Sequence, residues 1–305
     1  MYKLYQEVIT LKILVTGSKG QLGFDVIHEL EKRNHTAIGV DIEEMDITNA
    51  ESVEKVITQA HPDAVIHCAA WTAVDAAEDQ ENQPKVYKVN ADGTKNIAAV
   101  CKALDIKMMY ISTDYVFDGT GTDPWEPDCT DYSPLNVYGA SKLEGEKAVT
   151  AALSKYFIVR IAWVFGKNGS NFIKTMLKIG KNHSELRVVN DQIGTPTYTY
   201  DLARLLVDMI ETEKYGIYHA TNSGGYISWY DFACEIFRQA AQDGHSEYDT
   251  AHLTVHPVTT REYGLSKAAR PFNSRLEKSK LLENGFQPLP HWQDALRRYL
   301  QEIEY

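Results

Sequence analysis

The sequence of 305 residues is poor in cysteine and has no excess of basic side chains. Its four cysteines lie far apart without a CxxC pair, and Cys68 and Cys101 fall in apolar segments, where a free thiol behaves as a small hydrophobe. This usage favours a reduced, cytoplasmic compartment. The net charge of −11 and the pI near 5.4 argue against a nucleic acid polymer as partner, although an acidic protein can bind a single nucleotide through a few local donors.

Long apolar runs are also missing. No segment reaches the ~18 apolar residues that a membrane span needs, so no membrane is expected as a partner. Residues 1–11 include Lys3 and Glu7 and have no apolar core of signal-peptide length. We interpret them as a short extension, and a strand packed on the outside is one form it could take.

The first 41 residues contain the pattern of a dinucleotide-binding unit. A β-branched run at residues 12–16 is typical of a buried parallel strand. A Gly-x-x-Gly-x-x-Gly motif, a helix at 24–33 and a strand at 36–40 that ends at Asp41 follow it. This order and length are typical of a βαβ unit with its closing acidic residue. The alternative is a glycine loop that merely caps a helix, with Asp41 as a solvated turn residue.

The glycine motif predicts where a cofactor is held, because glycines let a diphosphate approach the free N–H groups of a helix N-terminus. Asp41 would accept hydrogen bonds from ribose hydroxyls, which favours NAD(H). Lys19 could instead meet a 2′-phosphate, so NADP(H) stays open. The residues predicted to bind NADPH or NADH are Gly17, Gly20, Gln21, Leu22, Gly23, Asp41, Asp46, Ile47, Ala70, Trp71, Thr72, Tyr138 and Lys142.

Strand and helix patterns alternate through the first half of the chain. Helices are predicted at 50–60 and 90–104, and strands at 64–67, 107–111 and 156–161. This alternation predicts an α/β fold with a doubly wound parallel sheet (Rossmann), whose ligands bind at the carboxyl ends of the strands. The loop at 114–137 is long enough to be functional.

After about residue 165 the pattern loosens, and we expect a smaller C-terminal α/β lobe that packs on the first half as a cap. Its predicted helices and short strands cover 172–181, 186–189, 200–211, 217–220, 229–241 and 291–302. We therefore assign 1–168 to an NAD(P)-binding domain and 169–305 to a substrate-binding lobe that is partly interleaved with it.

A tyrosine and a lysine occur four residues apart in Tyr138-Gly139-Ala140-Ser141-Lys142. On a helix such a pair shares one face, and an ammonium beside a phenol favours the phenolate. The same spacing recurs at Tyr263 and Lys267. Only the first copy opens an apolar-periodic helical run and follows a strand, so we predict acid–base chemistry there and none at the second copy.

The glycine motif, Thr113, Tyr138 and Lys142 together resemble the extended short-chain dehydrogenase/reductase family, and within it the dTDP-4-dehydrorhamnose reductases. The segments that carry the resemblance are 20–23, 70–75, 89–94, 112–117, 191–197 and 270–274. The glycine motif and the Tyr–Lys pair are common to the superfamily. The resemblance to the dTDP-4-dehydrorhamnose reductases in particular rests on residues 192–197 and 270–274. It covers nearly the whole chain apart from the N-terminal extension.

The resemblance implies hydride transfer from NADPH or NADH to the C4 ketone of a dTDP-linked sugar, with Tyr138 as proton donor. It implies that Lys142 lowers the pKa of Tyr138 and holds the nicotinamide ribose, and that Thr113 hydrogen-bonds the keto oxygen. The residues implied to bind the nucleotide sugar are Thr113, Asp114, Tyr115, Trp163, Arg270 and Asn273. A homodimer would fit the sequence, which does not give the oligomeric state.

Each role has a structural alternative. Thr113 could be an ordinary strand-end hydroxyl, Trp163 a core residue instead of a wall for the deoxysugar, and Arg270 a surface ion pair instead of a diphosphate ligand. Asn90 fits a water relay or a helix N-terminal cap equally well.

Some members of the family hold Mg²⁺ between subunits through acidic residues, one of them just after the glycine loop. That place is taken here by Asp25, shorter than the expected glutamate, and Asp201 and Glu302 could supply other ligands. Acidic residues on exposed helices are usually just solvated, so we predict no essential metal.

Two rival functions share these features. A nucleotide-sugar 4-epimerase would keep the glycine loop and the Tyr–Lys pair but retain NAD between turnovers. A non-catalytic regulatory subunit, like that of methionine adenosyltransferase, would bind NADP(H) and turn nothing over.

Overall fold

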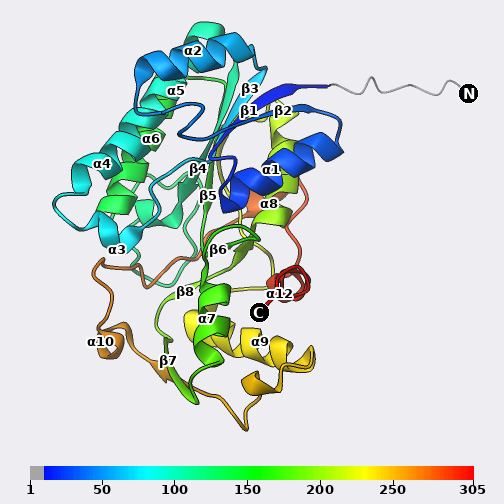
Figure 1. Cartoon of the computed structure of the whole chain (residues 1–305). Coiled ribbons are helices and arrows are strands. Elements are labelled where there is room, and N and C mark those ends of the chain that lie inside the picture. Colours follow the sequence, from blue (N-terminus) through cyan, green and yellow to red (C-terminus); the bar gives the residue numbers. More distant parts are fainter. Residues whose placement is uncertain (1–9) are drawn as a thin grey trace, which may run out of the picture.

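The computed structural model describes residues 10–305. Most of the expected N-terminal extension, residues 1–9, lies outside the described residues. A six-stranded sheet forms the larger part of the molecule, and all of its neighbouring strands run parallel (Figure 1). Its strands, in spatial order, are β10 (Gly216–His219), β5 (Tyr156–Ile161), β4 (Lys107–Thr113), β3 (Ala64–His67), β1 (Lys12–Thr16) and β2 (Thr36–Val40). The predicted doubly wound α/β fold is confirmed.

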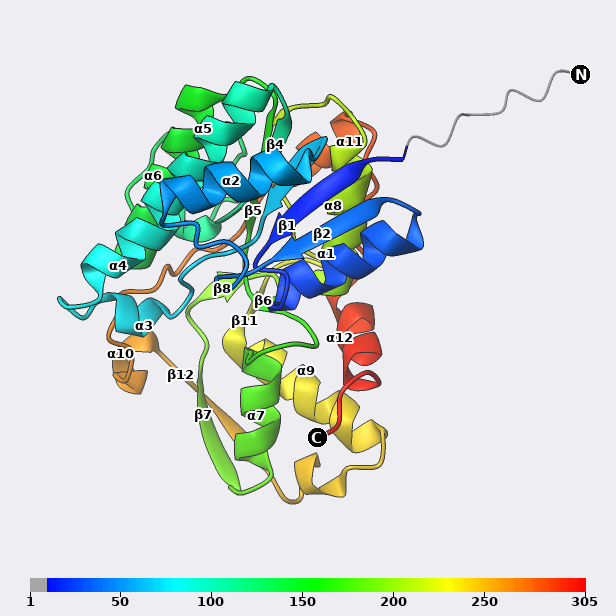
Figure 2. The same cartoon turned by 45° about the horizontal axis from the view of Figure 1, so that its top comes forward.

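Helices cover both faces of this sheet (Figure 2). One face carries α2 (Ala50–Ala60), α5 (Thr94–Leu104) and α6 (Val137–Ala152), and the other carries α1 (Gln21–Lys32), α8 (Thr199–Ile210) and α11 (Ser279–Glu283). Because side chains alternate along a strand, Ile13 and Val15 pack toward α1 and α8, whereas Leu14 packs toward α2 and α5. All three are fully buried, and each such side chain stabilises the fold by about 1.5–3 kcal/mol.

Short elements connect β3 to α5. They are α3 (Val74–Ala77), α4 (Gln83–Tyr87) and a π-helical turn at Lys88–Gly93 that continues into α5. A 3₁₀ turn at Asp114–Val116 follows β4.

The C-terminal lobe lies below the large sheet in Figure 1. It packs around its own apolar core. Its helices are α7 (Phe172–Gly180), α9 (Trp229–Gln242), α10 (Thr260–Tyr263) and α12 (Trp292–Leu300), and a 3₁₀ turn spans Ser246–Tyr248. Three strand pairs accompany them: β7 (Glu185–Val189) with β12 (Thr254–Val258), β8 (Ile193–Gly194) with β11 (Ile227–Ser228), and β6 (Val164–Phe165) with β9 (Thr197–Tyr198).

Most predicted elements match within one to three residues. The first helix begins at Gln21 and not at the predicted Phe24, because the tight turn of the glycine loop ends at Gly20, directly before the helix. The strand β4 extends two residues past the predicted end, to Thr113. The strand β10 pairs with β5, and α8 contacts α1, so a segment from the second half of the chain completes the large sheet.

All four cysteines are free thiols. Among residues 10–305, no helix is both long and apolar enough to cross a membrane.

Candidate active site

The glycine loop joins β1 directly to α1. Gly17 adopts φ +66°, a backbone conformation that favours glycine. A Cβ on Gly23 would lie 2.1 Å from the carbonyl oxygen of Gly17, so the close contact between loop and helix requires glycine there. Gly20 lies just before the first residue of α1 and has no side chain to cap the helix. The first N–H groups of α1, including those of Gln21 and Leu22, therefore lack a side-chain cap, and free N–H groups at a helix N-terminus are suited to binding a diphosphate.

Asp41 closes this loop at the end of β2. Its Oδ2 accepts hydrogen bonds from the Ser18 hydroxyl at 2.9 Å and from the Lys19 amide at 2.8 Å. The ammonium of Lys19 lies 3.0 Å from Glu43 at the surface. Asp41 thus lies beside the glycine loop, where it was predicted to meet a ribose.

Asp46 and Ile47 follow in the same connection. Asp46 accepts hydrogen bonds from the hydroxyl and amide of Thr48 at 2.8 and 2.9 Å. Ile47 packs against Gly93, where a Cβ would come within 2.9 Å of the isoleucine side chain. These contacts fix the connection between β2 and α2 next to the π-helical turn.

Asn90 links the segment after β3 to the helix α6. Its Oδ1 accepts from the Trp71 amide at 2.8 Å, and its Nδ2 donates to the Trp71 carbonyl at 3.2 Å and to the Ser141 hydroxyl at 2.9 Å. Asn90 is buried inside the π-helical turn, so the helix-cap alternative is wrong. The backbone of 70–72 is thereby held close to the helix that carries Tyr138 and Lys142.

The helix α6 starts with an asparagine cap and a close backbone contact. The Asn136 side chain accepts from the Gly139 amide at 2.8 Å, which satisfies one of the free donors of the first turn. A Cβ on Gly139 would lie 2.2 Å from the carbonyl oxygen of Tyr115. Glycine therefore lets the first turn, with Tyr138, lie against the 3₁₀ turn that follows β4.

Lys142 is buried beneath the sheet end, with 2% of its surface exposed. Its ammonium donates to the carbonyl oxygen of Ile111 at 2.7 Å and lies 4.0 Å from the centre of the Tyr110 ring. Burial lowers the pKa of Lys142 to about 7, against the opposing charge of Glu146 one turn further on. Its charge can therefore change near neutral pH.

Tyr138 lies beside Tyr115, Thr113 and Asp114. Its ring meets that of Tyr115 edge-on at 5.7 Å. Burial and the negative charge of Asp114 raise the pKa of Tyr138 above 10, whereas the neighbouring Thr113 hydroxyl opposes the rise. The phenol of the chain by itself therefore keeps its proton at neutral pH, as a proton donor must.

The strand end at Thr113 is itself held in place. The Thr113 hydroxyl donates to Asp114 at 3.0 Å and accepts from the Tyr115 amide at 3.2 Å. Burial raises the pKa of Asp114 to about 6. Thr113, Asp114, Tyr115, Tyr138 and Lys142, all predicted as site residues, are thus brought together at the carboxyl end of β4.

Trp163 lies just after β5 with φ +51°, an uncommon conformation for a large side chain. Its ring stacks on Trp229 at 3.7 Å with an interplanar angle of 15°. It is only partly buried and borders two apolar clusters. Trp229 was not predicted as a site residue, because nothing in the sequence indicates that it contacts Trp163, 66 positions earlier.

Arg270 forms a two-point ion pair with Asp75 of α3, both contacts at 2.9 Å. Asn273 is almost fully buried. Its amide nitrogen donates to the carbonyl oxygens of Thr120 and Asp123 at 3.1 and 2.8 Å. The guanidinium of Arg270 is thus partly exposed. The side-chain amide of Asn273 instead holds the loop that follows β4. Asp75 lies in a predicted segment but had no predicted role.

A buried arginine also holds this loop. Arg160 of β5 is fully buried and pairs with Glu146 of α6 at 2.7 and 2.9 Å. It also donates to the Tyr132 hydroxyl at 2.8 Å and to the Pro127 carbonyl at 3.2 Å. The loop between β4 and α6 is therefore packed against the helix that carries Tyr138. Arg160 was not predicted as a site residue, because the sequence of its short strand does not indicate these partners.

The three acidic residues considered as metal ligands each have protein donors. Asp201 accepts two hydrogen bonds from Arg298, at 2.9 and 2.7 Å. Asp25 accepts from Thr199 at 2.5 Å, and Glu302 from Tyr198 at 2.5 Å. Burial raises the pKa of Asp25 to about 6. The guanidinium of Arg298 thus occupies both oxygens of Asp201. Among residues 10–305, no group of three or more His, Cys, Asp or Glu side chains is placed to hold a metal ion.

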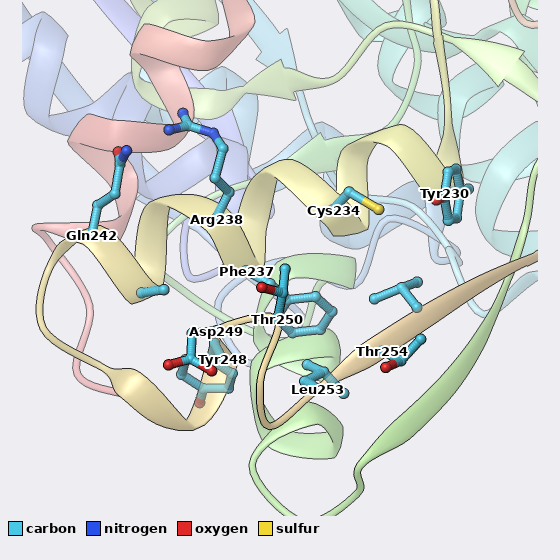
Figure 3. A pocket seen from close by; sticks show the side chains of 12 residues that line it. Tyr230, Cys234, Phe237, Arg238, Gln242, Tyr248, Asp249, Thr250, Leu253 and Thr254 are labelled. Carbon is cyan, nitrogen blue, oxygen red and sulfur yellow. The ribbon is translucent and has the colours of Figure 1, made fainter.

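A separate cavity of about 620 Å³ opens in the C-terminal lobe between α9 and β12 (Figure 3). Phe237, Arg238 and Leu253 are part of its lining. Among the described residues that line it, none is a predicted cofactor or sugar ligand. It is therefore distinct from the site around Tyr138.

Known proteins resemble the chain over almost its whole length. Residues 11–305 match the family described as RmlD substrate binding domain. The spore coat polysaccharide biosynthesis protein SpsK of Bacillus subtilis is 40% identical over 95% of this chain and 97% of its own. The dTDP-4-dehydrorhamnose reductase of Aggregatibacter actinomycetemcomitans is 39% identical over 94% of this chain and 97% of its own.

A solved structure agrees with this relationship. The dTDP-4-dehydrorhamnose reductase of Bacillus anthracis, in complex with NADP, has a TM-score of 0.89 and 39% identity, covering 97% of this chain and 100% of its own. Its fold supports the same arrangement of sheet and lobe. From the family match and these identities, we conclude that the chain belongs to the RmlD family.

Proposed function

We propose that the chain reduces dTDP-4-dehydro-β-L-rhamnose to dTDP-L-rhamnose, with NADPH or NADH as the reductant. The observation that carries this proposal is the group at the end of β4, where Tyr138 lies beside Thr113 and one helical turn from the buried Lys142. The name of the 39% identical Aggregatibacter relative supports the choice of sugar.

The cofactor fits the glycine-rich end of the sheet. A Cβ on Gly20 would come within 3.1 Å of the Gly17 carbonyl oxygen, so a side chain at this position would crowd the tight turn before α1. We assign the diphosphate to the N-terminus of α1, the adenosine ribose to Asp41 and the nicotinamide side to residues 70–72. When bound, the reduced cofactor supplies the hydride.

The side chains of the protein supply the proton and the positioning. A ketone that accepts hydride becomes an alkoxide, which must be neutralised. Tyr138 carries the proton for this oxygen at neutral pH, because burial and Asp114 keep its pKa high. Thr113 would hydrogen-bond the same oxygen. Lys142, when protonated, would bind the nicotinamide ribose and stabilise the phenolate that remains.

The C-terminal half would hold the sugar nucleotide. Trp163, stacked on Trp229, would form an apolar wall for the deoxysugar. Arg270 would bind the diphosphate. Asn273 would act indirectly, since its amide holds Thr120 and Asp123.

The test follows NADPH and NADH oxidation by the purified chain, with the 4-keto sugar nucleotide made in situ, and identifies the product by NMR. We expect equal amounts of cofactor oxidised and dTDP-L-rhamnose formed. Tightly bound NAD and an isomerised sugar without net oxidation would support the epimerase instead. Cofactor binding without turnover of the sugar nucleotide would support the regulatory subunit.

A further inference from the structure

One carboxylate holds the segment that contains Arg270. Asp75 accepts hydrogen bonds from the backbone amides of Lys267 and Ala268, at 3.1 and 3.0 Å, besides its two contacts with the guanidinium. These contacts join residues up to 195 positions apart. The hydrogen bonds to Arg270 and the two amides lower the pKa of Asp75 to about 2. The carboxylate is therefore charged at neutral pH, and four donors from one segment converge on it.

The other end of the same segment is held as firmly. The backbone amide of Asn273 donates to the carbonyl oxygen of Gly119 at 2.8 Å, and the backbone amide of Ser274 donates to the carbonyl oxygen of Ile193 at 2.8 Å. Arg270 therefore lies between two fixed points. Its charge is close enough to act on Tyr115, whose ring contacts Tyr138. The guanidinium is thus near the predicted reaction site and about one quarter exposed.

The pairing leaves part of the guanidinium available. Arginine has five N–H donors in a fixed plane. Two of them bond Asp75 and a third faces the Ala268 carbonyl at 3.4 Å. Among residues 10–305, the remaining two donors, one on Nε and one on Nη2, have no hydrogen-bond partner. Two donors on one edge match a phosphate group, which guanidinium binds at two points.

We propose that Asp75 is a positioning residue for the nucleotide-sugar diphosphate. It orients Arg270 so that the free edge of the guanidinium faces the phosphate oxygens. Asp75 itself does not touch the substrate. This inference rests on the proposed function, and it adds a residue from the cofactor-binding half to the recognition of the sugar nucleotide.

The test is a double-mutant cycle with Asp75→Ala, Arg270→Ala and the combination, measured as the KM of the sugar nucleotide, kcat and the Kd of NADPH. We expect Asp75→Ala to raise this KM by about tenfold, with kcat within about twofold and the Kd of NADPH unchanged. Because Asp75 acts only through Arg270, it should have no further effect in the Arg270→Ala background. If the KM of the double variant rose by the product of the two single effects, the proposal would be overturned. An unchanged or lower KM for Asp75→Ala would also overturn it.

A matched control is Asp79→Ala, which removes the carboxylate that pairs with Lys267 in the same segment. It should leave the KM unchanged. If Asp75→Ala folds poorly, Asp75→Asn removes the charge but keeps a side chain of similar shape, and the same rise in KM is expected.

Equilibrium binding of dTDP separates this inference from the proposed function, because it needs no turnover. Weaker dTDP binding by Asp75→Ala, without NADPH oxidation by the unmodified protein, would leave the positioning role standing and reject the reaction. Normal turnover with unaltered dTDP binding by the variant would reject only the positioning role.

Discussion

The chain contains the pattern Tyr-Gly-x-Ser-Lys twice, and the two copies lie in opposite environments. Tyr138 and Lys142 belong to the first turns of α6, a helix of 16 residues. Tyr263 is the last residue of α10, a helix of four residues, which ends at Gly264 in a left-handed conformation. Only the first copy therefore places tyrosine and lysine on one helical face.

Burial separates the two lysines further. Lys142 is 2% exposed and bonded to a strand carbonyl, whereas the Lys267 side chain is 53% exposed and pairs with Asp79. Desolvation lowers the pKa of Lys142 to about 7. The same five-residue pattern therefore gives a buried lysine with a lowered pKa only where a strand end and a long helix cover it.

The largest expected difference between the copies is catalytic. Tyr138→Phe removes the proposed proton donor, so kcat should fall by at least ~10²-fold, with the Kd of NADPH nearly unchanged. Tyr263→Phe is the matched control and should keep kcat within about twofold. Steady-state kinetics and fluorescence titration with NADPH measure both. Near-normal activity of Tyr138→Phe would exclude the phenol from the reaction.

The glycines of the two copies should differ in their effect on stability. A Cβ on Gly139 would lie 2.2 Å from the Tyr115 carbonyl, so Gly139→Ala must displace α6 from the 3₁₀ turn. We expect a loss of about 1–3 kcal/mol in the free energy of unfolding. Gly264→Ala meets no atom closer than 3.6 Å and should lose only the left-handed preference, about 1 kcal/mol.

Urea denaturation of both variants measures this difference. Equal losses for the two alanine variants would mean that α6 can shift away from the 3₁₀ turn at little cost.

The lysines should differ in their effect on the pH profile. The Lys142 ammonium exists below its pKa of about 7, so kcat/KM for NADPH, which reports the free enzyme, should fall as the pH rises through this value. Lys142→Arg keeps a permanent charge, so its residual activity should lack this fall. Lys267→Met should leave the profile unchanged. A wild-type profile that is flat between pH 6 and 8 (about one unit either side of the expected pKa) would contradict the assignment.

The smallest effect is expected for the ion pair of the second copy. Lys267→Ala removes an exposed contact with Asp79, which should lower the free energy of unfolding by less than about 1 kcal/mol. The difference should shrink further at about 1 M salt, because salt screens exposed charges. Thermal unfolding at low and high salt measures it, and a loss of several kcal/mol would show that this copy has a larger structural role.

Much of the first half could be predicted from the sequence, because its signals are local. The βαβ unit at the N-terminus follows from a β-branched run, three glycines and a closing Asp41 within about 30 residues. The predicted site residues around Thr113 and Tyr138 also lie together, since parallel strands present their carboxyl ends at one edge of a sheet. Their individual roles remain predictions.

Contacts between distant segments could not be predicted. Nothing local indicates that Arg160 pairs with Glu146 and holds the Tyr132 hydroxyl, or that Trp229 stacks on Trp163. The π-helical turn around Asn90 could not be predicted either, so the sequence did not show whether Asn90 caps a helix or lies within one. In each case the partner is chosen by packing in three dimensions, which a single sequence does not record.

By itself the sequence determined the order of strands and helices and the place of the glycine turn, because side-chain periodicity and backbone sterics act within a few residues. Only the tertiary structure decided which Tyr–Lys pair is buried, which carboxylate holds Arg270, and that β10 completes the first sheet. Those outcomes depend on desolvation and on contacts between segments far apart in the chain, and both arise only when the chain folds.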